Sequence, residues 1–176
     1  LAARAKRKER LDAIRALYDE TEALGKSGKF PEARAKVIEA CATLGGPSDA
    51  WRAPLIANAA WKVGHAAYRL GEFRTACKAW TIAREFRERI LPAEEPALLA
   101  VQLNLAQALG KVGDYRGARD LEVRVMDACE RTLPDGDAFR AHARSNLAAT
   151  KRALGDVRGA RTLYEGGPAL LQRSRP

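Results

Sequence analysis

The sequence lacks long apolar runs and has only three cysteines. No stretch approaches the roughly 18 apolar residues that a membrane span needs, and no apolar core follows the basic start as in a signal peptide. Cys41, Cys77 and Cys129 are widely spaced and belong to no CxxC pair or histidine cluster. This usage predicts reduced thiols in a cytoplasmic protein with no membrane partner, no bound metal and no cofactor.

Catalytic motifs are absent as well. The sequence has two histidines, His65 and His142, and contains no nucleophile elbow, no phosphate-binding glycine loop and no HExxH motif. Catalysis needs a nucleophile, a base or a metal arranged around one point. The sequence therefore predicts that the protein is not an enzyme.

The charge balance leaves one alternative function open. The net charge is +9, hydrophobic residues make up 47% and charged residues 30%, which is typical of a folded protein. The basic helical segment "AARAKRKERLDAIR", residues 2–15, suits nucleic acid, although it also contains acidic residues and an arginine excess fits a GC-rich genome equally well. A basic, nucleic-acid-binding helical protein is therefore the alternative interpretation.

The dominant feature that is present is an internal repeat. A glycine followed by a charged residue and then a bulky one (Val in the last copy) occurs at Gly28, Gly71, Gly113 and Gly155, at spacings of 43, 42 and 42 residues. Five residues after each glycine stands an alanine: Ala33, Ala76, Ala118 and Ala160. Apolar residues at helical spacing lie on both sides of each glycine. Each unit is therefore predicted to be a helical hairpin, with glycine ending the first helix and alanine allowing close helix contact.

The linkers predict where the first helices begin. Pro54 and Pro96 share one register that suits the first turn of a helix, and Asp137 is a natural N-cap. We expect helices from about residues 54, 96 and 138, within units at about 10–46, 53–92, 95–134 and 137–165. Gly166-Gly167-Pro168 is expected to leave 166–176 as a broken helix or capping tail. Because the sequence starts at Leu1 rather than Met, we expect it to belong to a longer chain.

The pattern resembles the tetratricopeptide repeat (TPR). The resembling residues are Asn104-Leu105-Ala106, Leu109, Gly113-Asp114-Tyr115 and Ala118, followed by Asn146-Leu147-Ala148, Gly155-Asp156-Val157 and Ala160. The usual unit has about 34 residues, and the longer unit is similar to the kinesin-light-chain-like subtype of bacterial signalling proteins. The resemblance implies an all-α fold, a right-handed α-solenoid of about four antiparallel hairpins that spans 1–176 as a single repeat domain.

The same resemblance implies a function and a set of groove residues. It implies a protein–protein interaction scaffold, a regulatory or adaptor module in bacterial signalling or defence, whose concave groove binds an extended peptide or partner protein, such as a protease or ATPase effector. The family's groove positions in the first two units fall on Arg15, Tyr18, Asp19, Glu22, Lys26, Asn58, Trp61, Lys62, His65, Tyr68 and Arg69. Those in the last two units fall on Leu103, Asn104, Gln107, Lys111, His142, Ser145, Asn146 and Arg152.

Chemistry refines the expected partner. One amide side chain can donate to a peptide carbonyl and accept from a peptide N–H, so Asn104 and Asn146, equivalent in adjacent repeats, could bind one extended backbone. Local bonding between helices is the other interpretation of these amides, as core packing is for Trp61 and Tyr68. The cations of the set, if not simply solvated, favour an acidic partner segment.

Overall fold

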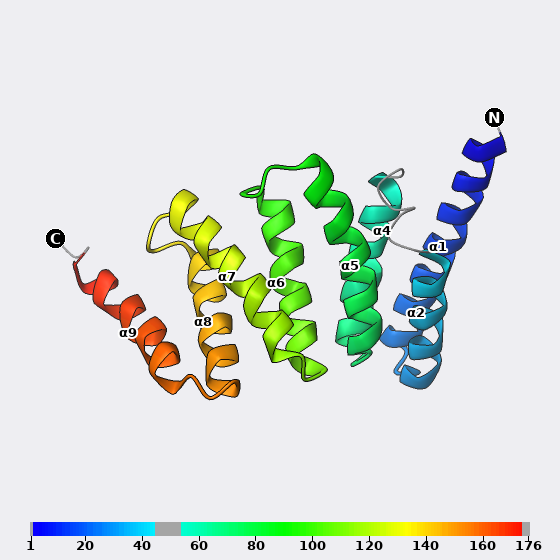
Figure 1. Cartoon of the computed structure of the whole chain (residues 1–176). Helices are drawn as coiled ribbons and strands as arrows, with labels where there is room; N and C mark the ends of the chain where they lie inside the picture. Colours follow the sequence, from blue (N-terminus) through cyan, green and yellow to red (C-terminus); the bar gives the residue numbers. More distant parts are fainter. Residues whose placement is uncertain (1, 45–53, 174–176) are drawn as a thin grey trace. The chain divides into compact units, whose positions relative to one another are not determined.

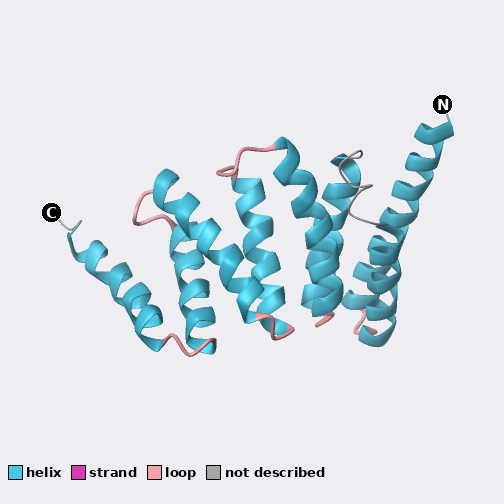
Figure 2. Cartoon of the chain, in the orientation of Figure 1, coloured by secondary structure: helices cyan, strands magenta, loops and turns pink. Residues whose placement is uncertain are grey.

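The computed structural model describes residues 2–44 and 54–173, and these residues form eight helices joined by short turns (Figure 1). No strand occurs within these two ranges (Figure 2). The helices are α1 (Ala2–Lys26), α2 (Phe30–Leu44), α4 (Pro54–Arg69), α5 (Phe73–Ile90), α6 (Pro96–Lys111), α7 (Tyr115–Thr132), α8 (Ala138–Ala153) and α9 (Val157–Arg173).

Consecutive helices pack as four hairpins, α1 with α2, α4 with α5, α6 with α7, and α8 with α9. The hairpins fall into two compact units, unit 1 at Leu1–Leu91 and unit 2 at Pro92–Pro176. The boundary between the units lies in the linker between the second and third repeats. Among the expected repeat limits, 46 and 53 fall outside the described residues, and α1 begins well before residue 10. That all four repeats form a single domain stays a prediction.

The four repeat glycines adopt the predicted turn conformation. Gly28, Gly71, Gly113 and Gly155 have φ of 76°, 79°, 88° and 86°, the left-handed region that a Cβ disfavours. The N–H after each glycine donates back to the last turn of the preceding helix, as Asp114 does to the Leu109 carbonyl at 2.9 Å. The four alanines five residues later are buried. The sequence repeat is therefore a repeat of helix ends and helix contacts.

The predicted helix starts are confirmed. Helices α4, α6 and α8 begin at Pro54, Pro96 and Ala138, and Asp137 caps α8 by accepting from the N–H groups of Phe139 and Arg140 at 2.8 and 3.1 Å. Proline is tolerated in the first turn of a helix because the N–H groups at those positions have no hydrogen-bond acceptor within the helix.

The expected break at Gly166-Gly167-Pro168 is wrong. Helix α9 continues through these residues to Arg173. A proline inside a helix removes one hydrogen bond and costs about 3 kcal/mol, but the turns on either side keep theirs. The local signal therefore marks a weak point in α9 rather than its end.

Candidate functional site

The first helices of the two repeats in unit 1 enclose a hollow of about 510 Å³. Successive stretches of α1 face successive stretches of α4, so the two helices run in the same direction along it. The residues that line it are Leu11, Ile14, Arg15, Tyr18 and Asp19 from α1, and Asn58, Ala59, Trp61 and Lys62 from α4. Six of these nine are predicted groove positions, so six of the eleven positions mapped in the first two repeats line this hollow.

The hollow combines aromatic walls with cations. Tyr18 and Trp61 are half-buried, and burial raises the pKa of the Tyr18 hydroxyl, with a smaller contribution from the charge of Glu22. Arg15 and Lys62 are exposed, and neither forms an ion pair with the residues that the structure describes. These two cations outnumber the one acid of the lining, Asp19, so the hollow favours an acidic ligand with apolar parts.

Trp61 is held in place by its neighbours in the α4–α5 hairpin. The His65 ring meets it edge-on with centroids 4.3 Å apart, and the Arg87 guanidinium lies over it at 4.9 Å from the ring centroid. The Trp80 indole N–H donates to the Trp61 carbonyl at 3.3 Å. Burial, and secondarily the charge of Arg69, lowers the pKa of His65, which keeps its imidazole neutral near pH 7. Trp61 is thus a fixed wall of the hollow.

Farther along α1 and α4, a smaller hollow of about 280 Å³ contains three more predicted residues: Glu22, Lys26 and Arg69. The Arg69 guanidinium forms an ion pair with the Glu22 carboxylate, joining α1 to α4. Because this pair already satisfies Arg69, an acidic partner would have to compete with Glu22 for it. Tyr68, also predicted for the groove, packs against Phe73 and Trp80 with centroids 5.3 and 5.7 Å away.

In unit 2, the first helices of the last two repeats share a polar row. The Gln107 amide nitrogen lies 3.3 Å from Nε2 of His142, which lies 3.5 Å from the amide nitrogen of Asn146. Gln107 comes from α6, and the other two come from α8. Asn104 lies half-buried one turn before Gln107, and Lys111 and Arg152 are exposed at the ends of α6 and α8. Gln107 and Asn146, two of the predicted amides, therefore lie on either side of His142. Leu103, also predicted for the groove, is instead a core residue and is 1% exposed.

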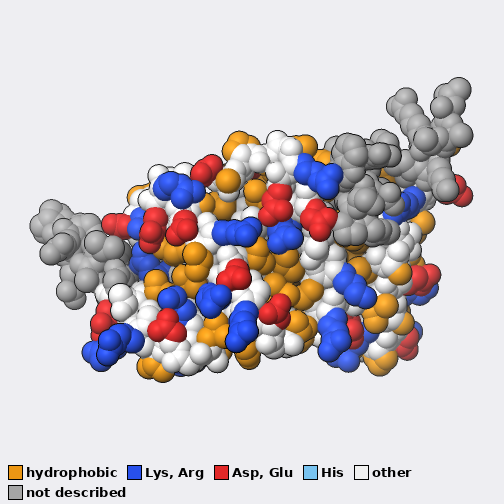
Figure 3. All heavy atoms as spheres, in the orientation of Figure 1, with side chains coloured by type: hydrophobic (Ala, Val, Ile, Leu, Met, Phe, Trp, Pro, Cys, Tyr) orange, Lys and Arg blue, Asp and Glu red, His pale blue; other side chains and the backbone are white. Residues whose placement is uncertain are grey.

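The charge distribution does not concentrate in a basic patch on the face shown in Figure 3, where Lys and Arg side chains are interspersed with Asp and Glu. Several charged side chains of the protein form ion pairs, including Arg34 with Glu72 and Arg131 with Glu94. No group of three or more metal-ligating side chains occurs among the described residues, and none of their helices is long and apolar enough to cross a membrane.

Two models of one repeat family match the sequence, each described as tetratricopeptide repeat: one at residues 98–137, the other at residues 141–165. The TPR-like repeats of a protein described as a kinesin light chain from Podosopora anserina superpose with a TM-score of 0.74, at 22% identity over 93% of this chain and 76% of that one. Residues 98–137 and 141–165, which belong to the last two repeats, thus match the tetratricopeptide repeat. A search of curated proteins found no match.

Two further solved structures share the fold of this chain. BtubC (BKLC) from P. vanneervenii superposes with a TM-score of 0.66, at 17% identity over 97% of this chain and 73% of that one. The apo form of RapI gives 0.64, at 9% identity over 95% of this chain and 45% of that one. The predicted all-α, TPR-like solenoid class is therefore confirmed. TPR repeats are a scaffold type, and their presence supports a protein–protein interaction scaffold as the coarse function.

Sequence reasoning missed two residues that shape the site. Trp80 and Arg87 lie on α5, a second helix, yet both contact Trp61: Trp80 donates to its carbonyl, and the Arg87 guanidinium lies over its ring. The available signal was the register of Trp80, which is that of the buried Val37 in the first repeat. The roles of the predicted groove residues in binding stay predictions.

Proposed function

We propose that the first helices of the repeats bind an extended, acidic segment of a partner protein. The observation that carries this is the hollow between α1 and α4, where Tyr18 and Trp61 offer apolar walls and Arg15 and Lys62 offer charge. Within unit 2, the amides of Asn104 and Asn146 would hold the backbone of an extended segment. Binding would exploit side-chain burial for affinity and the cations for orientation and encounter rate.

We further propose that the protein acts as a cytoplasmic adaptor or regulatory module in bacterial signalling or defence. In such a role it would hold an effector such as a protease or an ATPase, and would carry out no chemistry of its own. The absence of a nucleophile elbow or HExxH from the sequence supports the second part. The partner's own activity would then report the interaction.

The test starts from a displayed library of random 16-residue peptides selected on the full chain. We expect the selected peptides to be acidic, and the Asn104→Ala, Asn146→Ala double variant to raise the Kd of the best one more than tenfold. Lys62→Glu, measured as a separate variant, should raise the Kd of acidic peptides that bind the hollow of unit 1 at low salt, because it reverses a charge there. Arg124→Ala, on the exposed face of the second helix α7, is the matched control and should leave the Kd unchanged.

Two results would overturn the proposal. An unchanged Kd in the double asparagine variant would remove the amides from the site. Selection of peptides without acidic residues would remove the electrostatic argument. Tight, strongly salt-dependent binding of a 30-nucleotide single strand, in place of any peptide, would favour the nucleic-acid alternative.

A further inference from the structure

Unit 1 has a second groove, formed by the second helices α2 and α5 and separate from the hollow between α1 and α4. Its volume is about 500 Å³, within the range of about 300–1,000 Å³ that small-molecule sites occupy. Most of its lining is apolar or small: Ile38, Cys41, Ala42, Cys77, Thr81 and Ile82. The site proposed for the partner segment uses none of these residues.

The floor of this groove is well packed, and one rim is exposed. Cys41 is 8% exposed, and its Sγ lies 3.7 Å from the Thr75 carbonyl oxygen, which ties α2 to α5 at the base. Ile82 is buried beside it, whereas Ile38 at the rim is 47% exposed. The exposed rim makes an apolar ligand favourable, because such a ligand would remove Ile38 from water.

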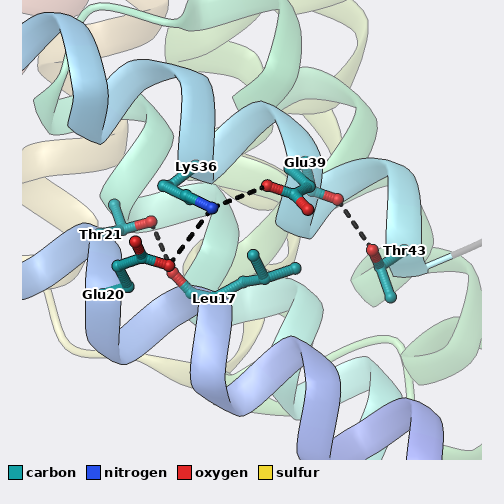
Figure 4. Close-up of polar contacts among 6 residues, drawn as sticks. All are labelled: Leu17, Glu20, Thr21, Lys36, Glu39 and Thr43. Carbon is teal, nitrogen blue, oxygen red and sulfur yellow. Dashed lines mark hydrogen bonds and ion pairs between the residues drawn. The ribbon is translucent and has the colours of Figure 1, made fainter.

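Of the residues lining the groove, Lys78 is the one that carries a charge. Its ammonium lies close enough to the Cys41 thiol to oppose the rise in thiol pKa that burial causes. Glu39, an acid of α2, pairs with Lys36, which also contacts Glu20 of α1 at 3.4 Å (Figure 4). The groove therefore presents an apolar trough with a single positive charge.

The hydrogen-bonding groups of the lining distinguish between ligand types. Apart from Lys78, the polar side chains are two threonine hydroxyls and two thiols, and no amide lines the groove. A buried peptide backbone would leave several N–H and C=O groups unpaired, at a cost of about 1–3 kcal/mol each. A saturated hydrocarbon chain has no such groups. The lining thus favours an aliphatic chain over a polypeptide.

We propose that the α2–α5 groove binds an aliphatic carboxylic acid, with its chain along Ile38, Cys41 and Ile82 and its carboxylate at Lys78. Charge complementarity fixes the orientation of the bound acid, because Lys78 is the one cation in the lining with which its carboxylate can pair. Burial of the chain supplies the affinity. The groove shares no lining residue with the hollow proposed for the partner segment. The scaffold could therefore bind a small amphipathic molecule and a partner protein at separate sites.

Calorimetric titration of the full chain with decanoate and with 1-decanol, both below their aggregation limits, tests the proposal. Lys78→Gln should raise the Kd of decanoate at least fivefold and should change the Kd of 1-decanol by less than twofold. Lys29→Gln is the matched control, because Lys29 is an exposed lysine in the turn between α1 and α2. It should change neither Kd. Ala42→Trp, which fills the groove from an exposed position, should abolish both.

Thiol reactivity provides a second measurement that does not depend on calorimetry. Cys77 is half-exposed in the groove, whereas Cys41 and Cys129 are buried. Decanoate should therefore slow alkylation of Cys77 by N-ethylmaleimide at least threefold in the natural sequence and not in the Ala42→Trp variant.

Three outcomes would overturn the proposal. These are decanoate binding that survives Ala42→Trp, equal weakening by Lys78→Gln and Lys29→Gln, and a dimer in sedimentation that Ala42→Trp dissociates. The last would assign the groove to a second copy of the chain. Competition between decanoate and the selected acidic peptide would show that the two sites are not independent, and would also contradict the assignment.

Discussion

The second and third hairpins share one backbone plan but fill their interiors differently. Trp80 of α5 and Glu122 of α7 stand 42 residues apart, at the same position of the repeat, and each is 2% exposed. The residues that face these two positions also differ between the two repeats. Gly64, against which Trp80 packs, is replaced in the third repeat by Ala106. A large ring needs a glycine opposite, and a smaller side chain leaves room for a methyl group.

This difference shows that the repeat fixes helix ends and close contacts rather than core composition. The second repeat builds its interior from rings, with Trp61 and Tyr68 around Trp80, whereas the third uses Leu103 and Glu122. Burial of aromatic surface in unit 1 also supplies the fixed wall of the hollow. The corresponding acid in unit 2 adds a titratable group to a hairpin core.

Removing the indole should give the largest effect. Trp80→Ala deletes a fully buried ring and its hydrogen bond to the Trp61 carbonyl, so we expect the free energy of unfolding to fall by about 3–5 kcal/mol in urea titrations. Tyr164→Ala, at the same repeat position in α9 but 45% exposed, is the control and should cost less than about 1 kcal/mol. Equal losses in the two variants would show that the ring is not a core element of its hairpin.

Glu122 should make the stability of unit 2 depend on pH. Burial raises its pKa from 4.5 to about 7, against a smaller opposing effect of the hydrogen bond with Thr150, and its Oε2 atom has no hydrogen-bond partner among the residues that the structure describes. The folded state therefore retains a proton that the unfolded state releases. The stabilisation is complete below pH 4.5 and is lost as the pH rises through about 7.

Glu122→Gln should remove this dependence. We expect the variant and the natural chain to be similar at pH 4, and the variant to be more stable at pH 8 by up to about 3 kcal/mol, the value of the pKa difference. Asp120→Asn, at an exposed carboxylate on the same helix, is the control and should show no such rise. A parallel pH profile for Glu122→Gln and the natural chain would mean that Glu122 is ionised in the folded state.

Adding a methyl group tests the pairing of Gly64 with Trp80. A Cβ at Gly64 would collide with the Trp80 indole, so Gly64→Ala should cost about 1–3 kcal/mol in thermal or urea unfolding. Gly110→Ala is the matched control within α6, because no atom outside its own helix lies within 4 Å of a Cβ there. It should stabilise the protein by up to about 1 kcal/mol. Destabilisation by both would indicate a general helix effect instead of a contact with the indole.

The features that local chemistry determines could be read from the sequence. Glycine at a helix end, proline in a first turn and Asp137 as an N-cap each depend on one residue and its backbone. The continuation of α9 past Pro168 could not be read in this way, because a helix survives an unfavourable residue when the turns around it hold.

The candidate site was only partly predictable for a related reason. Register places Trp61 and Lys62 on the first-helix surface, and the structure brings them together with Tyr18. The ion pair of Arg69 with Glu22 and the position of Arg87 over Trp61 depend on side-chain conformations and on the distance between helices. Neither quantity follows from spacing along the chain.

The turn glycines should show the smallest difference between the two hairpins, because the turn is what they share. Gly71 and Gly113 have φ of 79° and 88°, and neither has a neighbour closer than 3.8 Å to an added Cβ. The cost of a side chain there is therefore backbone strain and not collision. Gly71→Ala and Gly113→Ala should each lower the free energy of unfolding by about 1 kcal/mol, and Gly113→Val by at least as much.

Gly136→Ala is the control for these variants, since Gly136 lies in a linker without a positive φ and without a close neighbour. The free energy of unfolding of Gly136→Ala should differ from that of the natural chain by less than about 0.5 kcal/mol. Full stability of Gly113→Val would mean that the turn relaxes to accept a side chain. Unequal losses at Gly71 and Gly113 would mean that the different interiors of the two hairpins also govern their turns, so that core and turn are not independent parts of the repeat.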